Sequence, residues 1–427
     1  MEPKTLITGF PRIGEKRELK RALEKYWSGK ISLEELEAAS AELRKKHWLL
    51  QKEKGVDLIS CNDFSWYDHV LDTAVMLGAV PERFRGIEDD TDRYFAMARG
   101  TDDAVAMEMT KWFNTNYHYI VPELEESIRF KLDASKIVSE YAEAKSLGIR
   151  PKVNVLGPVS FLGLSKSGNG RDPYAFFEAV MAVYGDLVER LAELDDTVYL
   201  QCEEPIFVTD TTGEQLELLE RAYLELAGAA KTGAAKAGAA KSAAAGAESE
   251  PKVRIIVTTY FEHAKEAAAV LARTPVWGIG LDFVHGPRNI EALEVFREAG
   301  ATRLVAGVVD GRNVWVKDLD QSMRLLDRMT EFLDRDRILV STSCSLLHVP
   351  YGLDAEPESD INRWLSFASE KIDEVVLLGR LFHGAGEAVD GGSGEGTQKE
   401  VEAALERTRD VMRERRTSEL ITDPEVT

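Results

Sequence analysis

Cysteine is scarce in this sequence. Only three cysteines occur, Cys61, Cys202 and Cys344, and no Cys-x-x-Cys pair is present. An odd and widely spaced set provides neither a disulfide framework nor the ligand spacing of a structural zinc site. A reducing compartment suits such a chain, and we expect a cytoplasmic protein.

Long apolar runs are absent, and basic residues are outnumbered by acidic ones. No apolar stretch reaches the roughly 18 residues of a membrane-spanning helix, and the start, MEPKTLITGF, lacks the apolar core of a signal peptide. Acidic residues number 74 against 53 basic ones, so the formal net charge is −21. Because such a chain repels phosphate backbones, we expect neither nucleic acid nor membrane among its partners. A P-loop and a GxGxxG motif after a strand are missing too, which argues against a nucleotide site.

The 427 residues do contain an alternation of short β-branched runs and longer amphipathic stretches. The predicted strands are 4–9, 57–61, 153–157, 197–202, 253–259, 278–283, 303–309 and 337–342, with a weaker candidate at 117–121. The predicted helices are 32–54, 173–194, 213–227, 288–299, 317–334 and 358–380. The strand runs are almost continuously apolar, as is typical of parallel strands buried on both faces. The alternation therefore predicts an α/β fold, a (β/α)8 barrel of the TIM type.

Two segments fall outside the alternation. Residues 227–250 are an Ala/Gly/Lys tract, which we interpret as a flexible surface insertion. Residues 384–396 are rich in glycine and precede a charged helical pattern at 397–415. We therefore predict one barrel domain, 1–383, followed by a linker-like tail, 384–427.

Polar or strained residue clusters follow nearly every predicted strand. The clusters are Gly9-Phe10-Pro11-Arg12, Cys61-Asn62-Asp63-Phe64, Gly157-Pro158, Cys202-Glu203-Glu204-Pro205, Thr258-Thr259-Tyr260, Asp282-Phe283-Val284-His285, Asp310-Gly311-Arg312-Asn313 and Ser343-Cys344-Ser345. Barrel closure brings such clusters onto one rim, where barrels of this type bind their ligands. Loop starts are polar in any case, and a buried carboxylate such as Glu204 often only satisfies backbone donors. Both interpretations stay open for each cluster.

Paired carboxylates raise the alternative of a barrel hydrolase. Glu203, Glu204 and Asp282 could supply the two facing carboxyl groups of a glycosidase. Adjacent residues on a strand point to opposite faces, so at most one of Glu203 and Glu204 faces the barrel axis. Cys344 and His348 stand close in sequence, but they lie in a proline-ended loop, and we regard their spacing as coincidental.

One basic cluster stands out against the acidic background. Arg17 and Lys20 are three residues apart at the start of a predicted helix, hence on one face, and helix N-termini favour anions. Lys111 precedes an aromatic segment, Trp112 to Tyr119. Cations with planar neighbours suit a flat, polyanionic ligand, whereas a solvated helix face is the simpler explanation from pattern alone.

Seven longer motifs carry a family resemblance. They are GFPRIG with RELK (9–20), NDFSWYDHVLDT (62–73), MTKWFNTNYHYIVPE (109–123), LQCEEP (200–205), TTYFE (258–262), DGRNVW (310–315) and SCSLLHVP (343–350). In this order they resemble the amino-terminal domain of cobalamin-independent methionine synthase, over residues 4 to about 380. The later RRTSELITDPEV (415–426) resembles the segment that joins the two halves of that enzyme.

The resemblance implies a (β/α)8 barrel and a methyltransferase of methionine biosynthesis. The family transfers the methyl group of 5-methyltetrahydropteroyl-polyglutamate to homocysteine. By position, the resemblance assigns binding of the polyglutamate tail to Arg17, Glu18, Leu19, Lys20 and Lys111. The unrelated barrel hydrolase would leave the RELK and MTKWF motifs unexplained.

The catalytic zinc barrel of the family is absent from these residues. The two barrels of the family resemble duplicates of each other, and the resemblance allows this chain to be aligned with the zinc-binding barrel. In that alignment Thr258 and Tyr260 stand where the His-x-Cys ligands would be, and Asp282 and Cys344 stand at the other two ligand positions. We therefore expect no catalytic residue and no metal bound by this chain, with zinc held by a separate carboxy-terminal barrel as its partner. In that hypothesis, methyl transfer requires both polypeptides. The alternative is a non-catalytic folate-binding or regulatory module.

Overall fold

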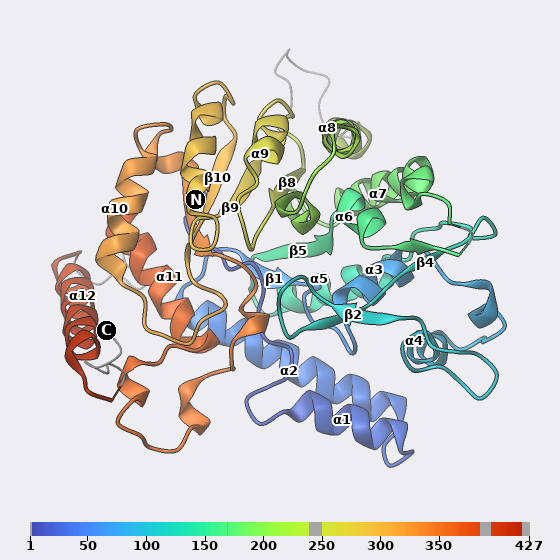
Figure 1. Cartoon of the computed structure of the whole chain (residues 1–427), viewed down its shortest axis with the longest axis horizontal. Helices are drawn as coiled ribbons and strands as arrows, with labels where there is room; N and C mark the ends of the chain where they lie inside the picture. The colour runs from blue at the N-terminus through green and yellow to red at the C-terminus, as the bar shows by residue number, and fades with distance from the viewer. Residues whose placement is uncertain (1, 169, 239–249, 385–393, 421–427) are drawn as a thin grey trace.

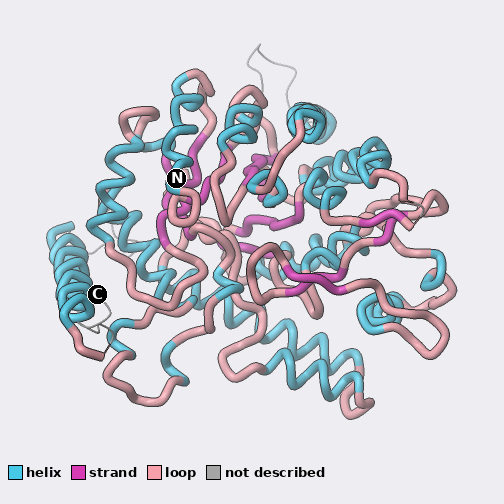
Figure 2. Tube along the Cα trace, viewed as in Figure 1, coloured by secondary structure: helices cyan, strands magenta, loops and turns pink. Residues whose placement is uncertain are grey.

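The computed structural model describes residues 2–168, 170–238, 250–384 and 394–420. Seven parallel strands in these ranges form one curled sheet, in the order β1-β5-β7-β8-β9-β10-β11. Their bounds are β1 (Ile59–Cys61), β5 (Pro151–Leu156), β7 (Val198–Glu203), β8 (Val253–Thr258), β9 (Gly278–Asp282), β10 (Arg303–Val309) and β11 (Ile338–Thr342). The strands lie at the centre of the molecule and the helices surround them (Figures 1 and 2).

The predicted first strand closes the gap between the two ends of this sheet. Thr5 forms a parallel bridge with Val340 of β11, and Leu6 forms one with Leu58, next to β1. The Leu6 amide donates to the Val340 carbonyl at 3.1 Å, and the Leu58 amide donates to the Thr5 carbonyl at 3.2 Å. The carboxylate of Asp57 accepts the amides of Lys4 and Thr5, at 2.8 and 2.9 Å. The predicted α/β barrel of the TIM type is thereby confirmed.

The barrel interior holds its own apolar cluster, apart from the larger core between strands and helices. Its members come from around the barrel: Leu6, Leu58, Tyr199, Ile256, Val305 and Leu339. All six are at most 3% exposed. Two residues further along the chain from Leu58 and Tyr199, the buried residues are polar, Ser60 and Gln201, and the buried Lys152 of β5 donates to both. The interior thus passes from an apolar layer to a polar one.

Most predicted helices are present. The α-helices are α1 (Glu18–Trp27), α2 (Leu33–Lys54), α3 (His69–Met76), α4 (Asp90–Arg99), α5 (Ser135–Ser146), α6 (Pro158–Gly163), α7 (Phe177–Leu191), α8 (Gly213–Gly238), α9 (Lys265–Leu271), α10 (Leu319–Met329), α11 (Ala368–His383) and α12 (Gly394–Thr417). The ends of helix α2 could be predicted because local signals mark both of them. Ser32 and Glu35 form a reciprocal capping box, and Gly55 ends the helix with a left-handed φ of 93°.

Three predicted elements differ from the structure. Residues 288–299 form 3-10 turns, η4 (Pro287–Arg297), held by the Asn289 side chain, which bonds to the Ala264 amide and the Asp282 carbonyl. The helix predicted at 358–380 begins only at Ala368, because Glu370 accepts the amide of Phe367 and caps it there. The weak strand at 117–121 lies outside the barrel.

That last segment forms an antiparallel hairpin. Its strands are β2 (Met109–Lys111) and β3 (His118–Ile120), and Lys111 pairs with His118. A second short pair joins β4 (Glu123–Leu124) to β6 (Lys166–Ser167). The hairpin is called the β2–β3 hairpin below.

The two atypical segments fall partly outside the described residues. Helix α8 runs into the predicted insertion as far as Gly238, and 239–249 lie outside the description, as do 385–393 of the predicted linker. Helix α12 coincides with the predicted charged helix and lies against the barrel helices (Figure 1). Within the described ranges, no helix is long and apolar enough to cross a membrane.

Candidate functional site

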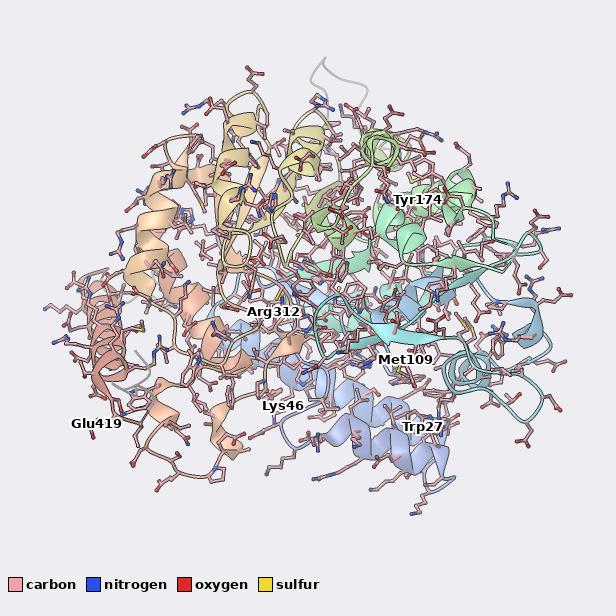
Figure 3. All side chains as sticks on the ribbon, viewed as in Figure 1. Trp27, Lys46, Met109, Tyr174, Arg312 and Glu419 are labelled. Atoms are coloured by element: carbon pink, nitrogen blue, oxygen red, sulfur yellow. The ribbon has the colours of Figure 1, made fainter. Side chains whose placement is uncertain are left out.

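The β2–β3 hairpin lies over the end of the barrel at which the strand-end clusters gather. Arg312, which follows β10, donates to the carbonyl of Asn114 at 3.2 Å, and its guanidinium lies 4.9 Å from the centre of the Phe261 ring. The rings of Phe113 and Phe261 lie 5.7 Å apart. Figure 3 labels Arg312 and the exposed Met109 of β2 in this region. The hairpin therefore covers the barrel mouth instead of leaving it open.

Backbone strain marks the contact between hairpin and barrel. Phe113 has a φ of 51° and Phe261 a φ of 87°, values that bulky residues rarely adopt. The Phe261 amide donates to Oδ2 of Asp282 at 3.0 Å, and this bond fixes the strained turn after β8. Two strained aromatic residues in contact indicate that the closed arrangement is held by the surrounding fold.

A polar network fills the barrel beneath the hairpin. The Lys152 ammonium donates to Ser60 Oγ at 3.1 Å, to Asn154 Oδ1 at 2.6 Å and to Gln201 Oε1 at 2.7 Å. Burial lowers the pKa of Lys152 to about 8, although the carboxylate of Glu203 opposes that shift. With three acceptors around it, the ammonium is fully satisfied, so the network is a polar core rather than an open site.

Glu203 completes the network. It accepts hydrogen bonds from Gln201 Nε2 at 3.0 Å and from the Tyr260 hydroxyl at 2.7 Å. The remaining cavity at the mouth encloses about 50 Å³ and is lined in part by Arg12, Asp63 and His348. At about 10 to 15 Å³ for each water on this measure, the space holds a few water molecules and is too small for a folate. The fold therefore brings the strand-end residues together at the barrel mouth, as predicted, and the β2–β3 hairpin covers them.

Two of the three carboxylates proposed for a hydrolase, Glu204 and Asp282, are occupied by backbone donors. Glu204 accepts the amides of Val159 at 3.2 Å and Ser160 at 2.7 Å, together with the Tyr223 hydroxyl at 2.8 Å. Glu203 enters the interior network while Glu204 bonds to the start of α6, so the two side chains point to opposite sides of the strand, as expected. Burial raises the pKa of Glu204 to about 7. This arrangement is that of a structural carboxyl group and disfavours the hydrolase.

Asp282 is saturated in the same way. One of its oxygens accepts the amides of Val284 and His285, both at 2.8 Å, and the other accepts the amide of Phe261. Its role is to fix the turns that follow β8 and β9. The ring Nδ1 of His285 lies 3.3 Å from Oδ2 of the same carboxylate.

The family's zinc chemistry finds no matching residues here. Of the positions aligned with the ligands, Tyr260 donates to Glu203, and Asp282 is occupied as described above. Burial raises the pKa of the Cys344 thiol well above its usual value, which disfavours the thiolate that zinc requires. In the part of the chain that the structure describes, no three His, Cys, Asp or Glu side chains are grouped to hold a metal ion. We therefore derive no step through zinc for this chain.

The predicted tail-binding residues lie at the first turn of α1. Arg17 caps the helix in a left-handed conformation with a φ of 61°. Arg17 and Lys20 are exposed, whereas Leu19 is 1% exposed and packs in an apolar cluster. Glu18 accepts the amide of Lys16 at 2.9 Å. The turn thus presents two cations, with Leu19 as its anchor.

Lys111 is also exposed, at the end of β2, and is followed directly by the buried Trp112. The apolar cluster that contains Leu19 also contains Ile120 of β3, so α1 and the hairpin share one packing unit. Arg12 is a further cation of this region, and no sequence pattern indicated a role for it. Its guanidinium donates to the Ser65 carbonyl at 2.7 Å and lies 5.8 Å from the Tyr117 ring.

Comparison with known proteins gives consistent matches. Residues 4–334 match a family model described as the N-terminal domain of the cobalamin-independent synthase. The 5-methyltetrahydropteroyltriglutamate–homocysteine methyltransferase of Desulforamulus reducens is 44% identical over 423 residues, which are 98% of this chain and 51% of that protein. The protein of the same name from Mycolicibacterium paratuberculosis is 44% identical over 389 residues, 90% of this chain and 48% of its own length. The chain spans about half the length of these relatives.

A solved structure agrees on the fold. A B12-independent methionine synthase from Shewanella sp. W3-18-1 superposes with a TM-score of 0.55, covering 88% of this chain and 92% of that one, at 14% sequence identity. At this identity the likeness concerns the fold alone.

The comparisons also correct one prediction. We predicted that a separate polypeptide supplies the remaining barrel. This prediction is wrong, because the relatives carry the matched half and the other half of their length in one chain.

Proposed function

The chain belongs to the family of the cobalamin-independent methionine synthase N-terminal domain, and on that premise we propose that it binds the polyglutamate tail of 5-methyltetrahydropteroyl-polyglutamate. The tail would be held for methyl transfer to homocysteine in cytoplasmic methionine biosynthesis. Since the chain's own residues do not fit zinc, activation of the homocysteine thiol is assigned to the half of the relatives' length that this chain does not span. The contribution of the present residues is recognition of the methyl donor.

The exposed cations at the start of α1 carry this proposal. A polyglutamate tail presents several carboxylates in sequence, and Arg17 and Lys20 present two cations on one exposed turn, where the helix dipole also favours anions. Among the residues that the structure describes, the one ion pair of Lys20 is with Glu24 on its own helix, at 3.7 Å, and both side chains are more than half exposed. Such a surface pair contributes little, so Lys20 can exchange Glu24 for a ligand carboxylate.

The other proposed residues have different parts. Leu19 anchors the turn through its burial, and its amide donates to the Ile13 carbonyl at 3.2 Å. Glu18 holds the preceding loop by accepting the amide of Lys16. Lys111, exposed on the β2–β3 hairpin, supplies a cation from the neighbouring element. The turn and the hairpin together would form the tail site.

We further propose a division into a barrel, 1–383, and a segment, 384–427, that resembles an interdomain connection. Helix α12 of that segment is tied to the barrel by charged contacts. Arg409 pairs with Asp320 at 2.8 Å and Arg416 with Asp318 at 3.0 Å. These contacts support a tail that folds back along the start of α10.

Calorimetric titration of this chain tests the tail site. We expect 5-methyltetrahydropteroyl-triglutamate to bind more tightly than the monoglutamate, with an advantage that shrinks as salt rises from about 0.05 to 0.3 M. Lys20→Ala and Lys111→Ala should each weaken triglutamate binding by about tenfold, near the weaker limit for a charge-assisted hydrogen bond, and leave monoglutamate binding unchanged. Lys25→Ala, in the last turn of α1, is the matched control. Equal affinity for both tails in every protein would exclude the proposed site.

A further inference from the structure

His285 lies at the barrel mouth between two carboxylates that belong to different loops. Its Nδ1 is 3.3 Å from Oδ2 of Asp282, at the end of β9, and its Nε2 is 3.8 Å from Oδ1 of Asp310, directly after β10. The side chain of Asp282 is fully buried and that of Asp310 is 9% exposed, whereas that of His285 is 27% exposed. The imidazole therefore lies within ion-pair distance of two buried carboxylates and can still exchange protons with solvent.

The first carboxylate fixes the turn that follows β8. Asp282 accepts the Phe261 amide at 3.0 Å. The Phe261 ring contacts the Phe113 ring of the β2–β3 hairpin, with ring centres 5.7 Å apart. A shift of Asp282 would therefore move the surface on which the hairpin ring lies.

The second carboxylate fixes the turn that carries Arg312. Asp310 accepts the amide of Arg312 at 2.8 Å and that of Asn313 at 3.1 Å. Arg312 in turn donates to the Asn114 carbonyl of the hairpin at 3.2 Å. The two carboxylates beside His285 thus hold two barrel loops that contact the hairpin.

The charge of His285 decides how well these two loops are held together. As an imidazolium it attracts both carboxylates. As a neutral imidazole it can donate to only one of them, and the two negative charges are left without a cation between them. Because like charges in a buried environment repel each other, the loops after β8 and β10 then lose part of what holds them together.

The surroundings of His285 favour the protonated form. The hydrogen bond to Asp282 raises the pKa of His285 above its usual value of 6.5, and Asp310 adds to the rise, while burial and Arg312 oppose it. A pKa raised by the closed arrangement means that protonation stabilises that arrangement. The stabilisation is complete below about pH 6.5 and is lost as the pH rises through the raised pKa.

Other titratable groups face His285 from the neighbouring loops. The Cys344 thiol lies near the same two carboxylates, and burial raises the pKa of Cys344 well above its usual value, so the thiol stays neutral. The backbone of Glu262, in the loop after β8, lies against Gly286, and its carboxylate is 3.3 Å from Nδ1 of His263. The imidazole of His263 is therefore the other titratable ring on this side of the mouth that has a carboxylate partner.

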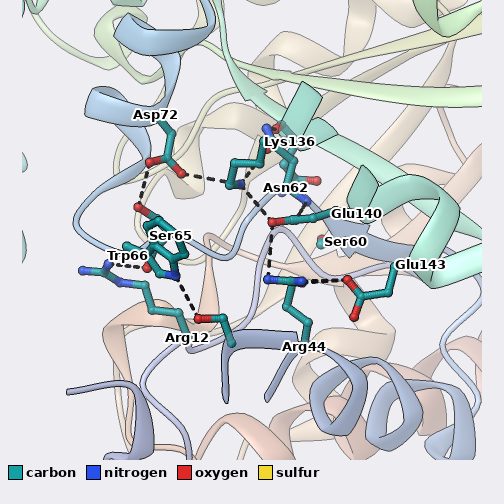
Figure 4. A network of polar contacts seen from close by, with 12 residues as sticks. Arg12, Arg44, Ser60, Asn62, Ser65, Trp66, Asp72, Lys136, Glu140 and Glu143 are labelled. Carbon is teal, nitrogen blue, oxygen red and sulfur yellow. Dashed lines mark hydrogen bonds and ion pairs between the residues drawn. The ribbon is translucent and has the colours of Figure 1, made fainter. Parts of the chain in front are cut away.

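Figure 4 shows a second charged network beside the mouth, between α2, α3 and α5. Lys136 pairs there with Glu140 at 3.2 Å; burial opposes the shift, but the carboxylate of Glu140 raises the pKa of Lys136, so the ammonium keeps its charge near neutral pH. Asp68 accepts an amide of β3 at 3.0 Å, and burial raises the pKa of Asp68 to about 7. His118 is exposed on the hairpin itself. Since these groups also affect the hairpin, the proteins to be compared must differ only at His285.

We propose that His285 is a pH-sensitive clasp: its imidazolium, between Asp282 and Asp310, keeps the β2–β3 hairpin closed over the barrel mouth, and loss of the proton loosens the hairpin. Loosening exposes the strand-end residues that the hairpin covers. This inference does not depend on the proposed function, because neither the clasp nor its test involves a ligand.

Hydrogen–deuterium exchange of the whole chain over 109–120 tests the clasp at a pH of about 6 and of about 8.5, with each rate divided by that of an unstructured peptide at the same pH. His285→Gln is neutral at both pH values, and His285→Lys keeps a cation at both. We expect His285→Gln to exchange about fivefold faster than the wild type at the lower pH, near the upper range for a partly exposed ion pair, and equally fast at the higher pH. His285→Lys should match the wild type at the lower pH and exchange about fivefold more slowly at the higher pH.

His263→Gln is the matched control, since it makes the same change at an imidazole that is 33% exposed and pairs with Glu262. Its exchange over 109–120 should equal that of the wild type at both pH values. Unchanged exchange in β5 and β7 shows that each variant keeps the barrel. Equal exchange of His285→Gln and the wild type at the lower pH, or the same difference at both pH values, would overturn the proposal. If His285→Gln disturbs the barrel strands, His285→Lys decides, and equal exchange with the wild type at the higher pH then overturns it.

Discussion

His47 shows how strongly a single side chain depends on its surroundings in this fold. Its imidazole is buried among aromatic rings, with the Phe10 and Tyr351 ring centres 5.2 and 5.5 Å away. Its Nε2 is buried without a hydrogen-bond partner. Burial, together with the nearby Lys46, lowers the pKa of His47 to about 3, so the folded chain holds it neutral.

Acid should therefore destabilise the protein through His47. As the pH falls below about 6.5, the imidazole takes up a proton in the unfolded chain but not in the folded one, so the free energy of unfolding decreases. This contribution is complete above pH 6.5 and is lost progressively towards pH 3. Between pH 7.5 and 5.0 it amounts to about 2 kcal/mol.

The variant His47→Phe should reduce the loss of stability between pH 7.5 and 5.0 by that amount. Phenylalanine suits an aromatic pocket and cannot titrate, so only the pH dependence is compared, whatever the variant's stability at pH 7.5. Urea unfolding at each pH measures it. His69, whose pKa burial also lowers to about 3, remains in both proteins, so some acid sensitivity persists. If the free energy of unfolding of the two proteins falls by the same amount between pH 7.5 and 5.0, the assignment to His47 is wrong.

Exposed cations of the candidate site could be proposed from the sequence, whereas buried polar contacts could not. Arg17, Lys20 and Lys111 are exposed, as a binding role requires. Charge and helical spacing are visible in a sequence. The sequence did not predict that the Lys152 ammonium lies in the barrel interior, because its acceptors come from three different strands. The pairing of Asp72 with Lys136 likewise joins α3 to α5 across the fold.

Among the elements, the β2–β3 hairpin has the largest effect on what the barrel can do. Strand-end residues of such barrels are usually open to ligands, and here the hairpin covers them. Arg312 connects the barrel to the hairpin through Asn114 and lies over the ring of Phe261. Because Lys111 lies on this hairpin, its position relative to α1 depends on the same contact.

Removing that side chain should loosen the hairpin. Arg312→Ala deletes one hydrogen bond and one cation–π contact, together worth about 1 to 2 kcal/mol. We expect amide exchange over 109–120 to become about tenfold faster, while exchange in the barrel strands stays the same. Hydrogen–deuterium exchange with mass spectrometry measures both. Arg297→Ala is the control, since that guanidinium lies 5.0 Å from the Phe332 ring, away from the hairpin. Unchanged exchange over 109–120 would show that other contacts hold it.

Element types were predictable where local signals agreed. Helix α2 combines a capping box, an apolar stripe and a glycine stop, and its observed bounds match the prediction. The segment at 287–297 carries a helical pattern, but it forms 3-10 turns because Asn289 bonds to β9 and to the turn before α9. A side chain bonded to distant backbone overrides periodicity, and single-sequence patterns do not reveal such bonds.

At the scale of the whole molecule, the first strand decides whether the barrel is closed. Residues around Thr5 and Leu6 bridge β11 on one side and the start of β1 on the other. The fold class was predictable because all eight apolar runs appear in the sequence with helical patterns between them. The closing strand pairs with its neighbours through two isolated β-bridges instead of a long ladder of hydrogen bonds. The spacing of apolar residues in the sequence does not predict that difference.

Leu6 links this closure to stability. It is fully buried in the interior cluster with Leu58 and Leu339. Leu6→Ala should lower the free energy of unfolding by about 2 to 5 kcal/mol, the range for a large-to-small change in a tight core. Leu224→Ala, at a position that is 47% exposed on α8, should change it by less than about 0.5 kcal/mol. Urea unfolding with equal denaturant slopes gives both values, and comparable losses would refute a closing role for Leu6.

The same closing strand has a consequence for synthesis. Its partners in β11 end at Thr342, so the ribosome must release more than three hundred further residues before the last seam can form. At ordinary translation rates, about 5 to 20 residues per second, the wait is on the order of tens of seconds. During that time the amino-terminal strand and the edge of β1 are available to wrong partners. The nascent chain should therefore depend on shielding by chaperones until the seam is complete.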